Sequence, residues 1–109
     1  MRLAIAATLC LLGAVPALAQ QSTEAGLRDC EKLALVQLKS LDPAFRRLVI
    51  QHADVAEDKF AAKVGSQFVS TIYHGTAAYQ ADSAPQDMRF ICLHAGVGKG
   101  AVFVYVLPR

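Results

Sequence analysis

Apolar residues between positions 27 and 41 recur every three or four positions, with charged and polar side chains at most positions between them. The spacing holds for Leu27, Cys30, Ala34, Leu38 and Leu41. Residues at this spacing lie on one side of a helix. The pattern therefore predicts an amphipathic helix over residues 27–41 with Cys30 on its apolar face. Asp42-Pro43 ends this helix, because proline disfavours helical backbone before it and lacks the N–H donor.

Beyond the helix, the pattern changes to the alternation and the β-branched or aromatic content of strands. Four segments have this character: 46–53, 67–80, 88–94 and 101–107. Residues 54–63 are charged and rich in alanine, and both a short helical turn and a wide connection are compatible with them. Gly75 falls in the middle of 67–80 and indicates a bulge or a bend, so the faces of the residues before and after it need not be continuous.

The turns after position 80 determine how the last strands run. Residues 81–87 and 96–100 are too short for the crossover that parallel neighbours require, so these strands form antiparallel hairpins. The chain is therefore predicted to have an α+β fold. One N-terminal amphipathic helix packs on a four-stranded antiparallel sheet.

The first 19 residues have the composition of a secretory signal peptide. Arg2 precedes an apolar run, and Pro16 is followed by Ala17-Leu18-Ala19, the small-x-small pattern that signal peptidase recognises. The apolar run of about 13 residues is shorter than the roughly 20 that span a bilayer, so no membrane span is expected after cleavage. We assign residues 1–19 to the signal peptide, 20–26 to a flexible lead-in and 27–109 to a single small domain that is periplasmic or secreted.

Cleavage after Ala19 removes Cys10 and leaves Cys30 and Cys92. An even number of cysteines in an oxidising compartment indicates a disulfide. This bond would join the apolar face of the helix to strand 88–94. Phe90 and His94 share the face of Cys92 and would then also point toward the helix.

The charge of the chain limits its partners. The net charge is +2, and removal of residues 1–19 takes away one basic and no acidic residue. The remaining basic residues are scattered along the chain rather than clustered. We therefore expect no nucleic-acid partner.

Candidate chemistry centres on three histidines, His52, His74 and His94, each on a different predicted strand. Imidazoles on neighbouring strands can converge on a zinc ion or act as general bases toward a nearby hydroxyl. No short ligand spacing and no nucleophile motif accompanies them, so they are only weak metal candidates. We expect no cofactor and no enzymatic activity. The alternative is a small periplasmic metal-binding protein or enzyme centred on these histidines.

The predicted sheet has more apolar residues than one helix can cover. The face away from the helix is predicted to carry Val69, Tyr73, Ile91, Leu93, Val102 and Val104. Three explanations are open: this face packs under residues 54–63, it forms a homodimer interface, or it binds an unknown protein or a small apolar ligand. The sequence thus predicts an exported, non-enzymatic binding or self-association module stabilised by one disulfide.

Overall fold

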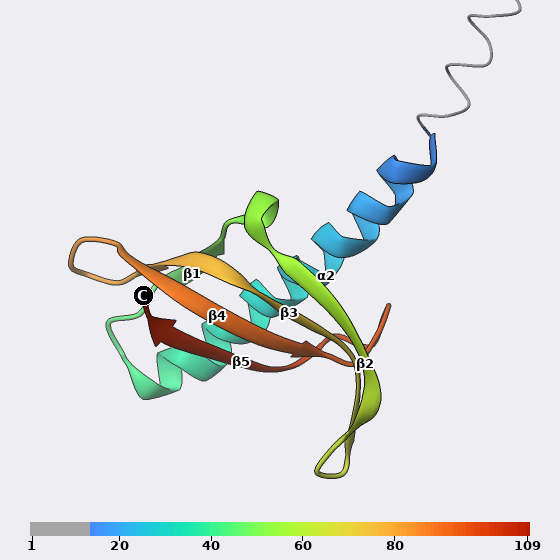
Figure 1. The fold of residues 1–109 in the computed structure, drawn as a ribbon. Helices are drawn as coiled ribbons and strands as arrows, with labels where there is room; N and C mark the ends of the chain where they lie inside the picture. Colours follow the sequence, from blue (N-terminus) through green and yellow to red (C-terminus); the bar gives the residue numbers. More distant parts are fainter. Residues whose placement is uncertain (1–13) are drawn as a thin grey trace, which may run out of the picture.

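A computed structural model describes the backbone of residues 14–109 and the side chains of residues 23–109. Within this part, one long helix lies on a five-stranded antiparallel sheet (Figure 1). The elements are α2 (Ala14–Leu41), β1 (Arg47–Ile50), the 3-10 turn η1 (His52–Asp54), β2 (Ala56–Val64), β3 (Gln67–Gln80), β4 (Gln86–His94) and β5 (Ala101–Pro108). The predicted α+β class is confirmed, but the sheet has five strands rather than four.

The additional strand, β2, comes from the segment 54–63 that the sequence pattern left open. Every residue of β2 is exposed, so the strand lacks the apolar alternation by which strands are recognised in a sequence. Its backbone pairs with β3 from Ala56 opposite His74 to Val64 opposite Gln67. Pairing rather than burial therefore makes this segment extended. Because β2 lies beside β3 in the same sheet, it covers neither face of that sheet.

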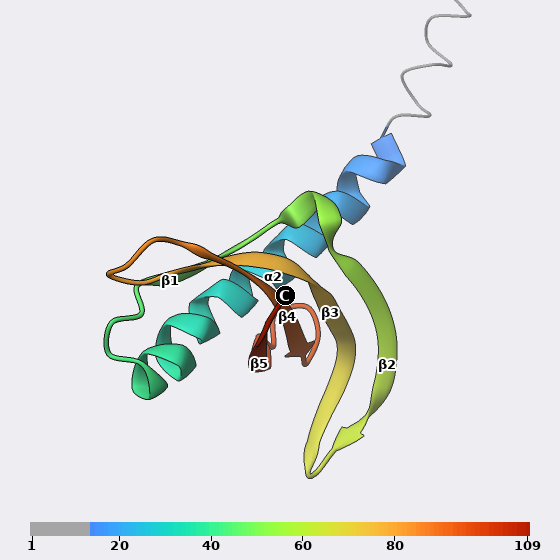
Figure 2. The ribbon, with the colours of Figure 1, turned by 60° about the vertical axis from the view of Figure 1, so that its left-hand side comes forward.

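β3 is the central strand. The sheet order is β1-β3-β4-β5, and β2 pairs with the first half of the β3 edge whose second half pairs with β1. Figure 2 shows β2 and β3 curving together.

The in-out alternation of β3 continues through Gly75, because Tyr73 and Ala77 are both buried and the pairing with β4 is unbroken. Gly75 therefore marks no bulge. A Cβ at this position would lie 3.0 Å from the Asp54 carbonyl oxygen, so glycine allows η1 to pass close to β3.

α2 lies on one face of the sheet, on the inside of its curve (Figure 2). Four of the five residues in the predicted apolar stripe are buried, whereas Leu41 is exposed because the chain leaves the helix there. The helix and the sheet share a core formed by Leu27, Cys30, Ala34, Leu38, Phe45, Leu48, Ile50, Tyr73, Ala77, Phe90, Cys92 and Val104. Full burial of a large apolar side chain contributes about 1.5–3 kcal/mol, so this stripe accounts for the position of α2.

The helix begins at Ala14, well before the predicted first residue, Leu27. Residues 20–26, predicted to be a flexible lead-in, are helical. Their glutamine, glutamate and alanine residues favour helix. They also continue, toward the N-terminus, a helical segment that is already packed on the sheet. Residues 1–13 of the predicted signal peptide lie outside the described part, and the signal peptide stays a prediction. No helix among the described residues is long and apolar enough to cross a membrane.

Candidate functional site

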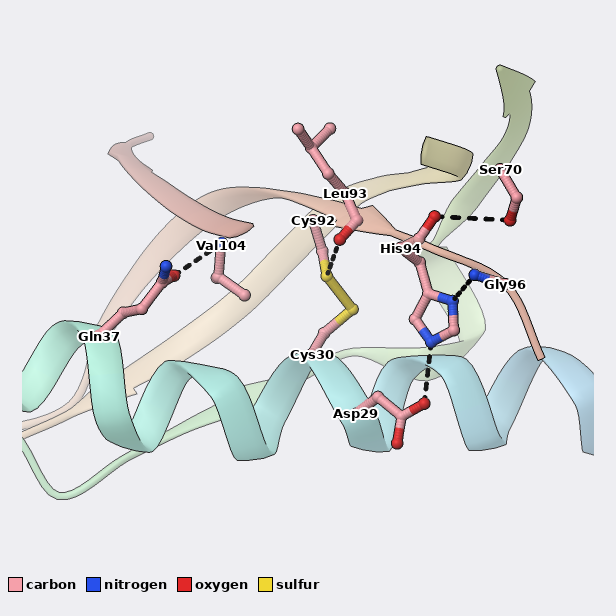
Figure 3. The surroundings of a disulfide bond; sticks show 9 residues. All are labelled: Asp29, Cys30, Gln37, Ser70, Cys92, Leu93, His94, Gly96 and Val104. Carbon is pink, nitrogen blue, oxygen red and sulfur yellow. Dashed lines mark hydrogen bonds and ion pairs between the residues drawn. A yellow bond between two sulfur atoms is a disulfide. The ribbon is translucent and has the colours of Figure 1, made fainter. Parts of the chain in front are cut away.

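A disulfide between Cys30 and Cys92 joins α2 to β4 (Figure 3). The Cα atoms of the two cysteines are 6.1 Å apart, and both side chains are fully buried. Phe90 and His94 are buried on the same side of β4. The predicted bond and the predicted direction of this strand face are confirmed.

Side chains of α2 also bind the backbone of two edge strands of the sheet, β1 and β5. Glu31 Oε2 accepts a hydrogen bond of 2.9 Å from the Ile50 N–H in β1. Gln37 Oε1 accepts one of 2.9 Å from the Val104 N–H in β5. Amides on an edge strand lack a neighbouring strand on one side. The helix therefore supplies acceptors to edge amides in addition to covering the core.

His94 is the one polar residue among the buried residues of the described part. Its Nε2 lies 2.8 Å from Asp29 Oδ2, and its Nδ1 accepts a hydrogen bond of 3.1 Å from the Gly96 N–H (Figure 3). Because Nδ1 is an acceptor, the ring proton is on Nε2 and is donated to Asp29. Both ring nitrogens are engaged within the protein. This arrangement ties β4 to α2 and leaves no ring nitrogen free to take a proton from a substrate.

The other two histidines each lie beside a different carboxylate. His52 Nε2 is 3.6 Å from Glu31 Oε2, and His74 Nε2 is 2.9 Å from Asp58 Oδ2 on the exposed side of the sheet. The three histidines therefore do not share one site. In the described residues, no group of three or more His, Cys, Asp or Glu side chains is placed to hold a metal ion.

A polar pocket of about 220 Å³ lies next to the Asp29–His94 pair. It is enclosed by α2, β2, β3 and the loop after β4, and its polar lining includes Asp29, Glu57, Ser70, Thr71, Tyr73 and His94. A Cβ at position 26 would overlap the Tyr73 hydroxyl, so Gly26 allows the helix to approach the tyrosine. We refer to this cavity as the polar pocket. No pattern in the sequence indicated it, because its lining comes from four separate segments.

Tyr73 forms one wall of the polar pocket. Its side chain is 5% exposed, and its ring meets the His94 ring edge-on with the centroids 5.8 Å apart. Burial raises the pKa of Tyr73, and the negative charges of Glu57 and Asp29 raise this pKa further. Among residues 23–109, none forms a hydrogen bond with its hydroxyl.

The structure divides the six residues predicted for the outer face between both sides of the sheet. Tyr73 and Val104 lie directly opposite Cys92 on the neighbouring strands, and directly opposite residues share a face. Both are therefore buried on the helix side, and Val69 is buried on this side of β3 as well. The prediction was wrong for these three residues. The register between paired strands decides which residues of neighbouring strands lie on the same face, and the sequence of one strand does not show this register.

The remaining three residues differ in their positions. Ile91 and Leu93 alternate with Cys92 and point away from the helix, whereas Val102 is half-buried at an irregularity of β5.

The uncovered face instead carries a different apolar set, which we call the outer patch. Its members are Ile72, Ile91, Leu93, Phe103 and Tyr105. One row across β3, β4 and β5 contains Ile72, Leu93 and Phe103, and Ile91 faces Tyr105 in the next row. Phe103 and Tyr105 are 45% and 49% exposed, and their rings stack with centroids 6.4 Å apart. The alternation along β5 indicates that Phe103 and Tyr105 share one face of the strand. Which face this is depends on the pairing register with β4, which the sequence does not show.

An apolar groove of about 420 Å³ adjoins the outer patch. It lies between the last turns of α2, including Leu38 and Leu41, and residues 103–106 of β5. Leu41 is 82% exposed at its rim. β5 forms one end of the sheet and has no charged residue between Ala101 and Pro108. The outer patch, the groove and an open strand edge are thus adjacent.

Comparison with known proteins identifies no relative. No protein-family model, no curated protein and no solved structure matches the chain. Function must therefore be inferred from the surfaces of the molecule itself.

Proposed function

We propose that the protein is an exported, non-enzymatic module that self-associates through the outer patch, with an unknown protein or a small apolar ligand as the alternative occupant. The observation that carries this proposal is the exposure of Phe103 and Tyr105 on the face of the sheet opposite to α2. Soluble monomers rarely expose contiguous apolar patches of large size unless the patch has a function. Burial of the outer patch against another surface would remove this exposure.

The open edge of β5 supports a second copy as the occupant. Natural edge strands usually carry charges or other features that prevent pairing with another chain, but the eight residues of β5 carry no charge. The helix occupies one amide of this edge, because Gln37 accepts a hydrogen bond from Val104, so a second copy would pair with the rest of the strand. Two copies related by a twofold axis would present the same strand and the same two aromatic rings to each other, so one surface suffices for both partners.

The position of β2 favours an external occupant. Residues 54–63 were the part of the chain that could have folded over the outer face. They instead extend the sheet along the edge of β3, where they pair with residues 67–74. Of the three explanations for the apolar surplus, the two that remain place a second molecule on the outer patch.

Export is supported by the N-terminal sequence pattern and by the disulfide. Structural disulfides persist in oxidising compartments and are rare in the cytosol of mesophiles. The Cys30–Cys92 bond is therefore compatible with a periplasmic or secreted protein.

The assignment as a non-enzymatic module is supported by the environment of the histidines. Both ring nitrogens of His94 bind groups of the protein, and His52 and His74 lie beside separate carboxylates. A metal-binding protein or enzyme centred on these three residues would require them to act at one site. No observation in the described part of the chain favours that alternative.

Sedimentation velocity over a range of protein concentrations tests self-association. We expect the average sedimentation coefficient of the wild type to rise with concentration as dimers form. Phe103→Lys places a charge in the outer patch and is expected to sediment as a monomer. Val36→Lys is the matched control, because Val36 is 69% exposed on α2, which covers the other face of the sheet.

A wild type that stays monomeric at every concentration contradicts self-association. Affinity capture from the cell envelope, with the wild type and Phe103→Lys compared, then tests the alternative occupant. If the wild type and Phe103→Lys capture the same partners in equal amounts, the outer patch is not the binding surface.

A further inference from the structure

The polar pocket contains two carboxylates that pair with no lysine or arginine among residues 23–109. Asp29 Oδ2 accepts a hydrogen bond from His94, and Glu57 Oε1 accepts one of 2.7 Å from Thr23 Oγ1. Neither Asp29 nor Glu57 forms an ion pair with a lysine or arginine among residues 23–109. The second oxygen of each carboxylate is therefore available to a ligand.

No positive charge within the lining neutralises these carboxylates. His94 is neutral, because its Nδ1 accepts the hydrogen bond from Gly96. Lys59 on β2 and Lys99 in the loop after β4 are on neighbouring segments, but neither lines the polar pocket. The pocket therefore presents two negative charges in a partly enclosed space, where opposite charges attract more strongly than in bulk water.

Tyr73 adds a hydroxyl that lines the same space. Its side chain is 95% buried, and its hydroxyl has no hydrogen-bond partner among residues 23–109. Buried polar groups in proteins are almost always paired with protein, water or ligand. No fully buried side-chain oxygen or nitrogen of the described residues lacks a partner, so this hydroxyl is reached through the polar pocket and can accept a ligand there, independently of the charges of Asp29 and Glu57.

We propose that the polar pocket binds a primary ammonium group through Asp29, Glu57 and Tyr73. An ammonium group has three N–H donors and one positive charge, which match three free acceptors and an excess of negative charge. The volume of about 220 Å³ equals that of roughly seven waters at about 30 Å³ each, so a short alkylamine or the end of a lysine side chain fits. The two carboxylates disfavour an anion.

This site is separate from the outer patch and does not depend on self-association. The polar pocket opens beside α2, on the helix side of the sheet, whereas Phe103 and Tyr105 lie on the opposite side. The ammonium group could be supplied by a free amine or by a lysine of another protein. Both sources share the same chemistry, and a titration can distinguish them.

Titrations of the purified full chain, observed by NMR of its backbone amides, test the proposal. The ligands are n-butylamine and N-acetyl-lysine amide, with n-butanol and butyrate as uncharged and negatively charged controls, all at one ionic strength and neutral pH. We expect saturable shifts at Asp29, Tyr73 and Gly96 with an amine and none with the controls. Tighter binding of the lysine derivative identifies a protein lysine as the source, and tighter binding of n-butylamine identifies a free amine.

Two substitutions test the assigned contacts. Glu57→Gln removes one charge, and Tyr73→Phe removes only the hydroxyl. Each is expected to weaken amine binding by about tenfold or more, the usual effect of losing a hydrogen bond to a charged group. Asp58→Asn is the matched control for the charge, because Asp58 is the next residue of β2 and binds His74 on the exposed side of the sheet. Tyr105→Phe is the control for the hydroxyl, and neither control should change the affinity.

The proposal is overturned if neither amine gives saturable shifts with the wild type. It is also overturned if n-butanol binds as well as n-butylamine, or if Glu57→Gln and Tyr73→Phe retain full affinity while their spectra show an intact fold. Shifts that require Glu57 and appear with calcium or magnesium but with no amine would reassign the polar pocket to a metal ion.

Discussion

Gly26 lies where α2 crosses Tyr73, and the absence of its side chain allows this close approach. A Cβ at position 26 would overlap the ring and the hydroxyl of Tyr73. In an exposed helix, replacing glycine by alanine stabilises by about 1 kcal/mol, but forcing extra atoms into a packed site costs about 1–3 kcal/mol. At position 26 we expect the cost of the steric overlap to exceed the gain in helix stability, because the overlap is with a rigid aromatic ring.

We predict that Gly26→Ala lowers the free energy of unfolding by about 1–2 kcal/mol, measured by urea denaturation. The control is the same substitution in a Tyr73→Leu background, where the overlapping ring atoms are absent. There Gly26→Ala should be neutral or stabilising. Equal destabilisation in both backgrounds would show that the contact with Tyr73 is not the cause.

Tyr79 connects the end of β3 to the turn after α2. Its hydroxyl donates a hydrogen bond of 2.6 Å to Asp42 Oδ2, and its ring packs on Phe45 with centroids 4.9 Å apart. Burial, followed by the hydrogen bond to Asp42 and the charge of Asp42, raises the pKa of Tyr79 to about 12. The folded protein therefore retains the phenol proton more strongly than the unfolded chain, in which the pKa is near 10.0.

We predict that this interaction stabilises the protein below pH 10 and that its contribution is lost as the pH rises through about 12. Tyr79→Phe should lower the free energy of unfolding at neutral pH by about 1–2 kcal/mol and should reduce the alkaline loss of stability. Urea denaturation from neutral to alkaline pH measures both effects. Tyr105→Phe serves as the control. If the wild type and Tyr79→Phe lose stability in parallel above pH 10, the bond to Asp42 does not have this role.

At the scale of elements, the disulfide connects the two parts that build the core. Cys30 and Cys92 are separated by 62 residues, and a cross-link across a loop of this length restricts the unfolded chain by about 4 kcal/mol in the loop-entropy model. A domain of this size has a total stability of about 5–15 kcal/mol. The bond is therefore expected to provide a large share of the stability.

We predict that the double variant Cys30→Ala, Cys92→Ala loses about 2–4 kcal/mol of unfolding free energy, measured by denaturant titration. Reduction of the wild type should produce a loss of similar size. A small loss in both cases would mean that α2 stays on the sheet through its apolar stripe and the hydrogen bonds of Glu31 and Gln37 without help from the disulfide.

The elements also differ in how far their sequences predict them. The core-facing part of α2 and the strand 88–94 have apolar spacing imposed by burial on one side, and both were predicted. β2 is exposed along its length and forms through pairing with β3, so its own side chains carry no pattern. Residues 20–26 of α2 were missed for a related reason, since a mostly polar segment that extends a packed helix needs no apolar stripe.

At the scale of the whole molecule, the two proposed sites lie on opposite sides of one sheet and have opposite chemistry. The outer patch is apolar and belongs to β3, β4 and β5, whereas the polar pocket is acidic and lies beside α2. Phe103→Lys should therefore affect association without weakening amine binding, and Glu57→Gln should do the reverse. Failure of one proposal leaves the other intact.

The sequence by itself determined the α+β class, the apolar face of the helix, the pairing of Cys30 with Cys92 and the orientation of His94 toward the helix. These features follow from local periodicity and from the number of cysteines, because each reflects which side of one element avoids water. The tertiary structure alone decided the strand β2, the faces of Tyr73 and Val104, the outer patch and the polar pocket. Each of these depends on the register between strands or on segments that are distant in the sequence, and backbone hydrogen bonds set that register without leaving a pattern in any single segment.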